Sequence, residues 1–270
     1  MAHASPAEIW NRGDYQQIAF EHVLVSEILC ASLSIAAGQT VADVACGTGN
    51  TALAAARRRA AVTGIDIAPN LIDRARTRAS SEGLSKIEFL VGDAAAIPLP
   101  DETFDFVLST FGSAFLPDQE NAAAELVRLA KPGGTIALTA YTRQSLPSEV
   151  YHLGAALAPP PEGAALPAYV WSDGVRAREL LGPHCSAITI THRTVDACFS
   201  SAAAFLENSE RFYGPIMTRM ARFSEDQRVQ FRAGMIDILE RHNRANDGTL
   251  MAVFDYAEII AVKRLLPPGH

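Results

Sequence analysis

The chain has 270 residues, 49% of them hydrophobic and 20% charged, so it is long enough to bury a sizeable core. Its 23 basic and 30 acidic side chains give a net charge of −7, which argues against a nucleic-acid partner. The four cysteines lack metal-ligand or CxxC spacing, so we expect no metal site and a reducing, cytoplasmic location. Neither a signal peptide nor an apolar run of about 18 residues is present, so no membrane span is expected.

Residues 1–37 precede the first predicted strand and are expected to form a helical lid. Asp14 and Gln17 have the spacing of a capping box, which predicts a helix that begins beside Asp14. Phe20 and Leu24 follow at a four-residue spacing, so this helix is predicted to bury the face that carries them.

The central motif is an apolar, β-prone run at residues 41–45, followed by two glycines and an alanine-rich helix former. Gly47 and Gly49 permit a sharp turn and leave no Cβ between the main chain and a ligand. Free N–H groups at the start of the next helix would face a polar ligand. A strand, a glycine turn and a helix start in this order indicate a nucleotide-binding βα unit.

This loop alone leaves two kinds of ligand open. Gly47, Gly49 and Ala52 fit the dinucleotide-binding fingerprint, and Asp66 lies at the end of the next predicted strand. Asp43 argues against a dinucleotide, because a carboxylate at this position repels a diphosphate and suits a cationic ligand. A nicotinamide-dependent oxidoreductase therefore remains a disfavoured alternative.

Four further strands are predicted in this half of the chain, at residues 61–67, 87–91, 104–109 and 135–141. Because ligands of open α/β sheets bind at the carboxyl ends of the strands, Asp66 is expected to reach ribose hydroxyls of the ligand. By the same rule, the residues after the strand at 104–109 are expected to reach the ligand site.

Five motifs follow one another in the order and at the spacing found in Rossmann-like, class I S-adenosylmethionine-dependent methyltransferases, at residues 41–50, 62–71, 91–94, 98–105 and 129–134. Over about residues 38–142 the chain resembles this family, and in particular its ubiquinone/menaquinone-biosynthesis type. The resemblance implies an α/β fold with a seven-stranded, mostly parallel sheet, an antiparallel last strand and helices on both faces.

The resemblance also implies S-adenosylmethionine as the cofactor and S-adenosylhomocysteine as the product, without a metal. Asp93 would accept the adenine amino group, the Ala94 N–H would donate to an adenine ring nitrogen, and Thr110 would contact the cofactor. Trp10 and Tyr15 either pack in the lid or contact the ligands. The implied cofactor site comprises Tyr15, Asp43, Ala45, Gly47, Thr48, Gly49, Asp66, Ile67, Asp93, Ala94, Thr110 and Phe111.

The second half of the chain carries two predicted insertions. Residues 144–170 are rich in proline and are expected to form a loop-rich segment that lines the pocket. Residues 200–246 show a helical pattern, broken at Gly214 and Pro215, and are expected to form a cap over the mouth of the site. Residues 38–199 and 247–270 would then form the Rossmann-like domain, with the last strand antiparallel.

The sequence favours methyl transfer to a small-molecule acceptor by in-line displacement (EC 2.1.1.-). Residues 109–112 stand where amide and adenine N-methyltransferases carry an Asp/Asn-Pro-Pro-Tyr motif, so carbon, oxygen, small-amine and sulfur acceptors remain open. A methyltransferase-like cyclase or isomerase, or a non-catalytic S-adenosylmethionine-binding module, is the alternative, and a homo-oligomer is possible. No catalytic base is assigned; the candidates are Tyr15, His152, Tyr213 and His242.

Overall fold

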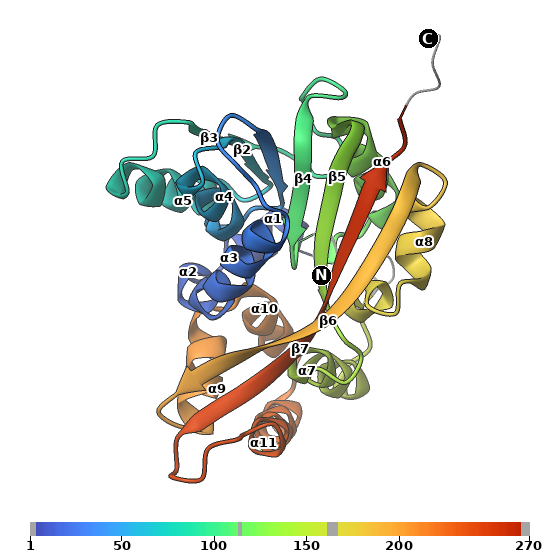
Figure 1. Ribbon diagram of the computed structural model, residues 1–270. Helices are drawn as coiled ribbons and strands as arrows, with labels where there is room; N and C mark the ends of the chain where they lie inside the picture. The colour runs from blue at the N-terminus through green and yellow to red at the C-terminus, as the bar shows by residue number, and fades with distance from the viewer. Residues whose placement is uncertain (1–3, 113–114, 161–166, 266–270) are drawn as a thin grey trace.

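The computed structural model describes residues 4–112, 115–160 and 167–265. A seven-stranded sheet of order β3-β2-β1-β4-β5-β7-β6 forms its centre (Figure 1). The strands are β1 (Thr40–Val44), β2 (Ala61–Asp66), β3 (Ile87–Val91), β4 (Phe104–Thr110), β5 (Ala130–Tyr141), β6 (Cys185–Phe199) and β7 (Leu250–Lys263). Strands β1 to β5 pair in parallel, whereas β7 is antiparallel to both β5 and β6. The predicted Rossmann-like sheet with an antiparallel last strand is therefore confirmed.

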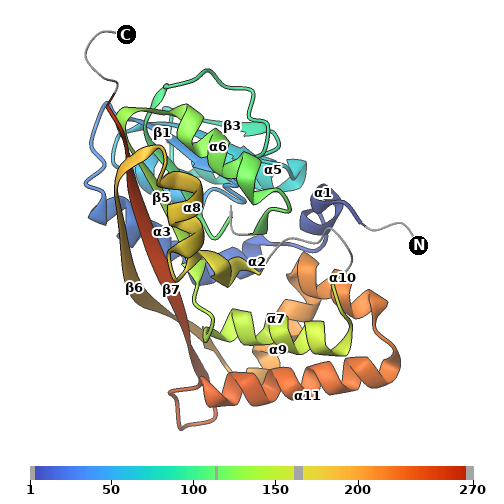
Figure 2. The same cartoon turned by 90° about the vertical axis from the view of Figure 1, so that its right-hand side faces the viewer.

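Helices cover both faces of this sheet (Figure 2). One layer holds α3 (Val23–Ser32), α4 (Asn50–Arg57) and α5 (Pro69–Ser81), and the other holds α6 (Gln119–Leu129) and α8 (Val175–Leu181). Successive residues of a strand point to opposite faces, so Val41 of β1 packs in the first layer and Ala42 in the second. Burial on both faces explains why the central strands β1, β4 and β5 are largely apolar runs rather than alternating ones.

Phe89 of β3 fixes the position of the glycine loop. Its ring lies against Gly64, its register partner on β2, and against Gly49 in the loop after β1. A Cβ on Gly64 would lie 2.6 Å from the ring, and one on Gly49 would lie 3.2 Å from it. Absence of side chains at these two positions therefore lets the loop pack directly on the sheet.

A two-stranded ribbon extends past the carboxyl end of β5. Tyr141, the last residue of β5, pairs with Tyr256, whereas the β6–β7 ladder continues to the pair of Phe199 and Leu250. This ribbon carries the cap, which consists of α9 (Ala202–Phe212), α10 (Gly214–Arg222) and α11 (Glu225–Arg241). The cap therefore lies beyond the edge at which ligands of this sheet class bind (Figure 1).

The segment at residues 144–170 is not the loop-rich insertion that its prolines suggest. It contains α7 (Leu146–Leu157), with Pro147 in the first turn, and the 3₁₀ helix η3 (Ala168–Trp171). Proline is compatible with a helix in the first turn, because the N–H that it lacks has no helical partner there. Helix α7 packs against α11, so it enlarges the cap; residues 161–166 lie outside the described part of the chain.

The capping box predicted at Asp14 is wrong. The N-cap of α2 (Gln16–Ala19) is Tyr15 and makes no side-chain cap, while Asp14 pairs with Arg74 at 3.2 Å. A capping box does occur earlier, where Ser5 and Glu8 begin α1 (Pro6–Trp10).

The buried face predicted for the N-terminal helix is also wrong. Phe20 and Leu24 are 59% and 57% exposed, whereas Val25 and Leu29 are buried. The 3₁₀ helix η1 (Phe20–His22) lies between α2 and α3 and interrupts the α-helical phase. Because the helical phase changes at η1, the four-residue spacing of Phe20 and Leu24 marks the exposed face and not the buried one.

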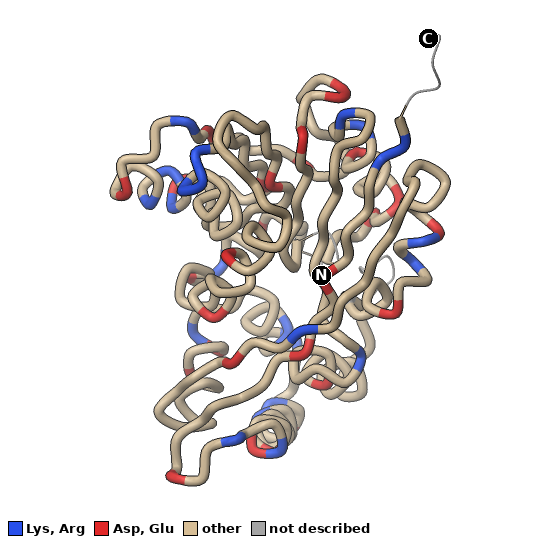
Figure 3. Tube along the Cα trace, viewed as in Figure 1, with Lys and Arg blue, Asp and Glu red and all other residues tan. Residues whose placement is uncertain are grey.

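Basic and acidic positions are interleaved around the outside of the fold (Figure 3). Arg57 at the end of α4 contacts both Glu27 and Glu82, and Arg76 of α5 contacts Asp73. These arginines therefore face carboxylates of the same chain. None of the described helices is long and apolar enough to cross a membrane.

The substitution Gly64→Ala is expected to destabilise the protein by about 1–3 kcal/mol, because the new methyl group would overlap the Phe89 ring. Chemical denaturation of the wild type and the variant measures the loss. Phe89→Leu should restore part of the stability in the double variant, since it removes the ring that is contacted. A double variant whose loss equals the sum of the two single losses would contradict this contact.

Candidate functional site

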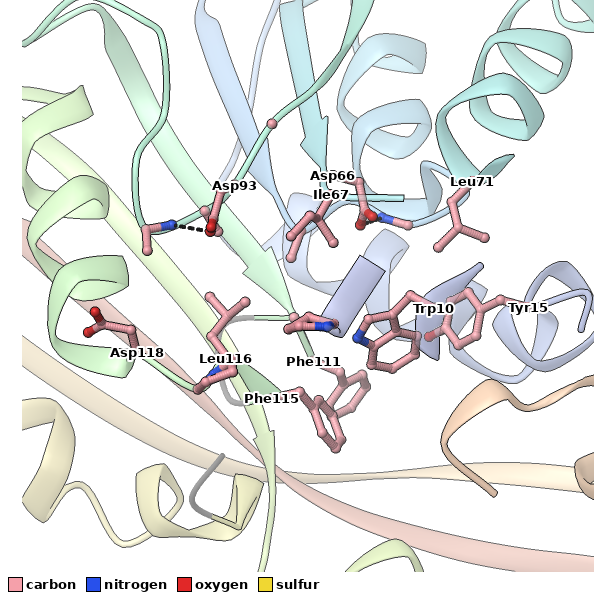
Figure 4. Close-up of a pocket in the computed structure, with 18 of the residues that line it drawn as sticks. Trp10, Tyr15, Asp66, Ile67, Leu71, Asp93, Phe111, Phe115, Leu116 and Asp118 are labelled. Atoms are coloured by element: carbon pink, nitrogen blue, oxygen red, sulfur yellow. Dashed lines mark hydrogen bonds between the residues drawn. The ribbon is translucent and has the colours of Figure 1, made fainter. Parts of the chain in front are cut away.

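Most of the predicted cofactor residues meet at the carboxyl ends of β1, β2 and β4 (Figure 4). One cavity, called the main cavity below, is lined by Tyr15, Ala45, Gly47, Asp66, Ile67, Asp93, Ala94, Thr110 and Phe111 together with residues that the sequence did not single out. A second, smaller cavity shares Tyr15, Gly47 and Thr110 with it and is called the inner cavity. Asp43 and Thr48 line the inner cavity. Gly49 packs against the ring of Phe89 on the sheet side of the loop.

The glycine loop bends through left-handed backbone conformations. The φ angles are 55° at Ala45, 54° at Gly47 and 85° at Gly49. A Cβ on Gly47 would lie 3.3 Å from the ring of Tyr15, so the lid approaches the loop closely at this point. Ala45 has a strained conformation for a residue other than glycine, which sequence spacing does not reveal.

Asp66 joins two loops with its carboxylate. Its Oδ2 accepts a hydrogen bond from the Gly47 N–H at 2.8 Å, and its Oδ1 accepts one from the Ala68 N–H at 2.9 Å. Burial raises the pKa of this carboxyl, and the backbone donors oppose that rise. A carboxylate offers about four acceptor sites, more than these backbone donors fill, so Asp66, which lines the main cavity, can still accept a ribose hydroxyl.

Asp43 stabilises the start of α4. Its Oδ2 accepts a hydrogen bond from the Ala52 N–H at 2.8 Å, which is favourable because helix N-termini attract negative charge. The side chain is only 1% exposed, and this burial raises the pKa of Asp43 to about 8. A positively charged ligand group in the inner cavity, which Asp43 lines, would lower this pKa and be attracted by the carboxylate that then forms.

A chain of hydroxyl groups holds Thr110 in place. The Thr110 hydroxyl lies 2.7 Å from that of Thr51 on α4, which lies 2.9 Å from that of Ser26 on α3. All three residues line the inner cavity. Ser26 and Thr51 carry no sequence signal of their own, because single hydroxyl residues in helices are common.

The opposite end of the main cavity is mostly apolar. Asp93 is exposed and accepts a hydrogen bond from the Ala95 N–H at 2.9 Å, which fixes the loop after β3. Leu71 and Leu116 line the same cavity.

Six aromatic side chains, called the aromatic wall below, close the lid side of the site: Trp10, Tyr15, Phe111, Phe115, Tyr141 and Tyr213. Trp10 lies 5.5 Å from Tyr15 and 6.2 Å from Phe115 between ring centroids. Phe111 stacks on Tyr141 at 4.3 Å. Figure 4 shows Trp10, Phe111 and Phe115 grouped below Asp66 and Ile67. Lid, strand ends and cap all contribute to this wall.

The four candidate bases fall into two groups. Tyr15 lines both cavities, and Tyr213 packs against it with ring centroids 6.3 Å apart. His152 is exposed and hydrogen-bonded to Tyr169, and His242 is hydrogen-bonded to Glu149. Neither histidine is among the residues that line the two cavities in the described part of the chain.

His22 is a site residue that the sequence did not indicate. It is buried, lines the inner cavity and lies with its Nε2 2.6 Å from the hydroxyl of Tyr141. Burial lowers the pKa of His22 to about 4, so its ring is neutral at neutral pH. The hydrogen bond ties the N-terminal segment to the end of β5.

Comparisons with known proteins identify the family and the fold of the chain. The family described as methyltransferase domain matches residues 42–138. An uncharacterized protein of Mycobacterium tuberculosis is 31% identical over 225 residues, 83% of this chain and 82% of the relative. A demethylmenaquinone methyltransferase of Bacillus licheniformis is 36% identical over 107 residues, 38% of this chain and 45% of that enzyme. The crystal structure of the cyclase SpnF has the same fold, with a TM-score of 0.56 and 22% identity over 95% of this chain and 85% of SpnF.

The neutral, buried state of His22 predicts a specific pH dependence. Between about pH 6.5 and about pH 4 the unfolded chain binds a proton at this residue that the folded chain does not, so His22 lowers stability by about 3 kcal/mol as the pH falls through this window. His22→Gln removes this contribution, and comparison of the two chains cancels the carboxyl groups that titrate in both. Denaturant unfolding at several pH values measures the difference.

His192→Gln on the exposed side of β6 is the matched control and should follow the wild type. Parallel pH profiles for the wild type and His22→Gln would contradict a neutral, buried His22.

Proposed function

Because the chain belongs to the Rossmann-like, class I family of S-adenosylmethionine-dependent methyltransferases, we propose that it transfers the methyl group of this cofactor to a small-molecule acceptor. The observation that carries the proposal is the joint geometry of Gly47 and Asp66. A glycine without Cβ lies beside a buried carboxylate that retains lone pairs, at the edge where nucleosides bind in this fold.

The residues present fit this cofactor along its whole length. Asp66 would hold the ribose, and Asp93 with the Ala94 N–H would hold the adenine. Asp43 and the hydroxyl of Thr110, in the inner cavity, suit the charged amino-acid end. When bound, S-adenosylmethionine supplies an electrophilic methyl group on a positively charged sulfur. The faces of the aromatic wall would attract that charge.

The protein's part in such a reaction is to position the reactants and exclude water. Holding two reactants in line lowers the barrier by about 7–11 kcal/mol. Trp10 and Tyr15 from the lid and Phe111 from the sheet edge line one end of the main cavity, and their rings would keep water from the reacting atoms. We propose that the acceptor lies against this aromatic wall, below the cap, and is an aromatic or lipid-like small molecule.

A second candidate function keeps the cofactor but not the methyl transfer. A cyclase or isomerase would use the bound positive charge only to stabilise charge in its substrate. The apolar, aromatic lining of the site is compatible with a carbon-rich substrate of that kind. Release of S-adenosylhomocysteine together with a methylated product distinguishes the transferase from this alternative and from a non-catalytic binding protein.

Calorimetric titration with S-adenosylmethionine, S-adenosylhomocysteine and NADH tests the cofactor. We expect micromolar binding of the first two, none of NADH, and a loss of at least about tenfold in Asp66→Ala, which removes a hydrogen-bonded charge. Asp93→Ala is the companion variant, because this exposed residue fixes a single loop and should weaken binding less. Binding of NADH alone would refute the methyltransferase proposal.

A further inference from the structure

The hydroxyl chain of Ser26, Thr51 and Thr110 ends between the two cavities. Ser26 Oγ lies 2.9 Å from Thr51 Oγ1, and the Thr51 hydroxyl donates to Thr110 Oγ1 at 2.7 Å. Ser26 is 1% exposed and Thr51 is 2% exposed, so both bonds are shielded from bulk water. Ser26 and Thr51 line the inner cavity, and Thr110 lines both cavities. The chain therefore leads from a buried position on α3 to the site.

The number of protons fixes the direction of this chain. A hydroxyl group carries one proton and two lone pairs. Because Thr51 donates its proton to Thr110, Ser26 must be the donor in its contact with Thr51. Thr110 accepts at the end of the chain, and its own proton has no acceptor within the described residues. This proton is therefore available to an acceptor atom of a ligand in either cavity.

The inner cavity offers few other donors that are free. Among the described residues that line it there is no lysine or arginine. Arg78 of α5 donates instead to the carbonyl and the hydroxyl of Thr48, at 2.7 and 3.2 Å, and to Asn50 Oδ1 at 2.8 Å. The amide nitrogen of Asn50 donates in turn to the carbonyl of Ala19 at 2.7 Å. These side chains are bonded within the protein, whereas the Thr110 proton is not.

On the basis of the proposed function, we propose that Ser26 and Thr51 are positioning residues that direct the Thr110 hydroxyl to the carboxylate of S-adenosylmethionine. The chain thus recognises this carboxylate through a neutral donor and not through a cation. Asp43 lines the same cavity and attracts the ammonium group of the same amino-acid end. Asn50 and Thr51, the first residues of α4, also line it, so the positive end of the helix dipole adds to the attraction.

Contacts with α3 keep Thr51 in the position that this role requires. Cys30 Sγ, one turn after Ser26, donates to the Thr51 carbonyl at 3.8 Å. An unbonded threonine hydroxyl can rotate, whereas the Thr110 oxygen is occupied on one side by the Thr51 proton and must turn its own proton elsewhere. Hydrogen bonds in a chain also polarise one another, which makes Thr110 a better donor. A purely structural link between α3, α4 and β4 would stabilise the fold without any preference among ligands.

Decarboxylated S-adenosylmethionine is the probe that isolates the carboxylate, because it keeps the adenosine, the sulfonium and the ammonium groups. Titration calorimetry of both forms at about pH 7 gives the preference for the intact cofactor as a ratio of Kd values. Thr110→Val should lower this ratio on the order of tenfold or more, because it removes a donor to a charged group. Thr51→Val should lower it roughly threefold to tenfold, and Ser26→Ala at least about twofold. Thr51→Ser keeps the hydroxyl and should retain the wild-type ratio.

Thr63→Val is the matched control. Thr63 on β2 is buried, its hydroxyl donates to Glu88 at 2.9 Å, and it is not among the described residues that line the cavities. It should keep the wild-type ratio, and any loss of stability should appear in denaturant unfolding alone. None of these substitutions changes a formal charge, so the effects of Asp43 and Asp66 on the ligand charges cancel in the comparison.

A ratio that stays at the wild-type value in both Thr51→Val and Thr110→Val would overturn the proposal. A wild type that binds the decarboxylated form as tightly as the intact cofactor would also overturn it, and this measurement needs no variant that must fold. Both results require that the ligands bind, so they leave the proposed function in place. Binding of neither form, nor of S-adenosylhomocysteine, would instead refute the proposed function itself.

Discussion

The two hydrogen bonds that Asp66 accepts from backbone N–H groups hold the cofactor half of the protein together. One donor, Gly47, belongs to the loop after β1, and the other, Ala68, to the loop after β2. Both loops leave neighbouring parallel strands, so a single carboxylate at the end of β2 can span them. Without it two buried donors would lack partners, at a cost of about 1–3 kcal/mol each. The same constraint places the carboxylate beside the cavity.

The sequence was sufficient to predict the strands around Asp66 and the loops that follow them, because the signals for these elements are local in the chain. Apolar runs mark the strands, and parallel pairing brings their carboxyl ends to one edge. Gly47, Asp66 and Asp93 each follow or end such a run, so their convergence needs only the topology. The structure places all three beside the main cavity.

The contacts of the lid with the end of β5 and with the cap were not predictable in the same way, because they join distant parts of the chain. His22 meets Tyr141 across 119 residues, and Trp10 of the lid packs against Tyr213 of the cap, with ring centroids 6.0 Å apart. No spacing rule connects such pairs. The 3₁₀ turn at η1 also shifts the helical phase, so Phe20, which the periodicity assigned to the core, is exposed. His152 and His242 attracted attention by residue type alone, and in the described part of the chain neither lines the main or the inner cavity.

The closing pair of the β6–β7 ribbon has an evolutionary consequence. Phe199 and Leu250 are cross-strand partners, so the chain leaves the ladder for the cap and returns to it at the same rung. Replacing the intervening helices by a tight turn would leave every strand register unchanged. Descendants of this fold can therefore exchange the cap while inheriting the strands and the glycine loop intact. Under the proposed function, the choice of acceptor and the binding of the methyl donor would then be encoded by largely separate stretches of gene.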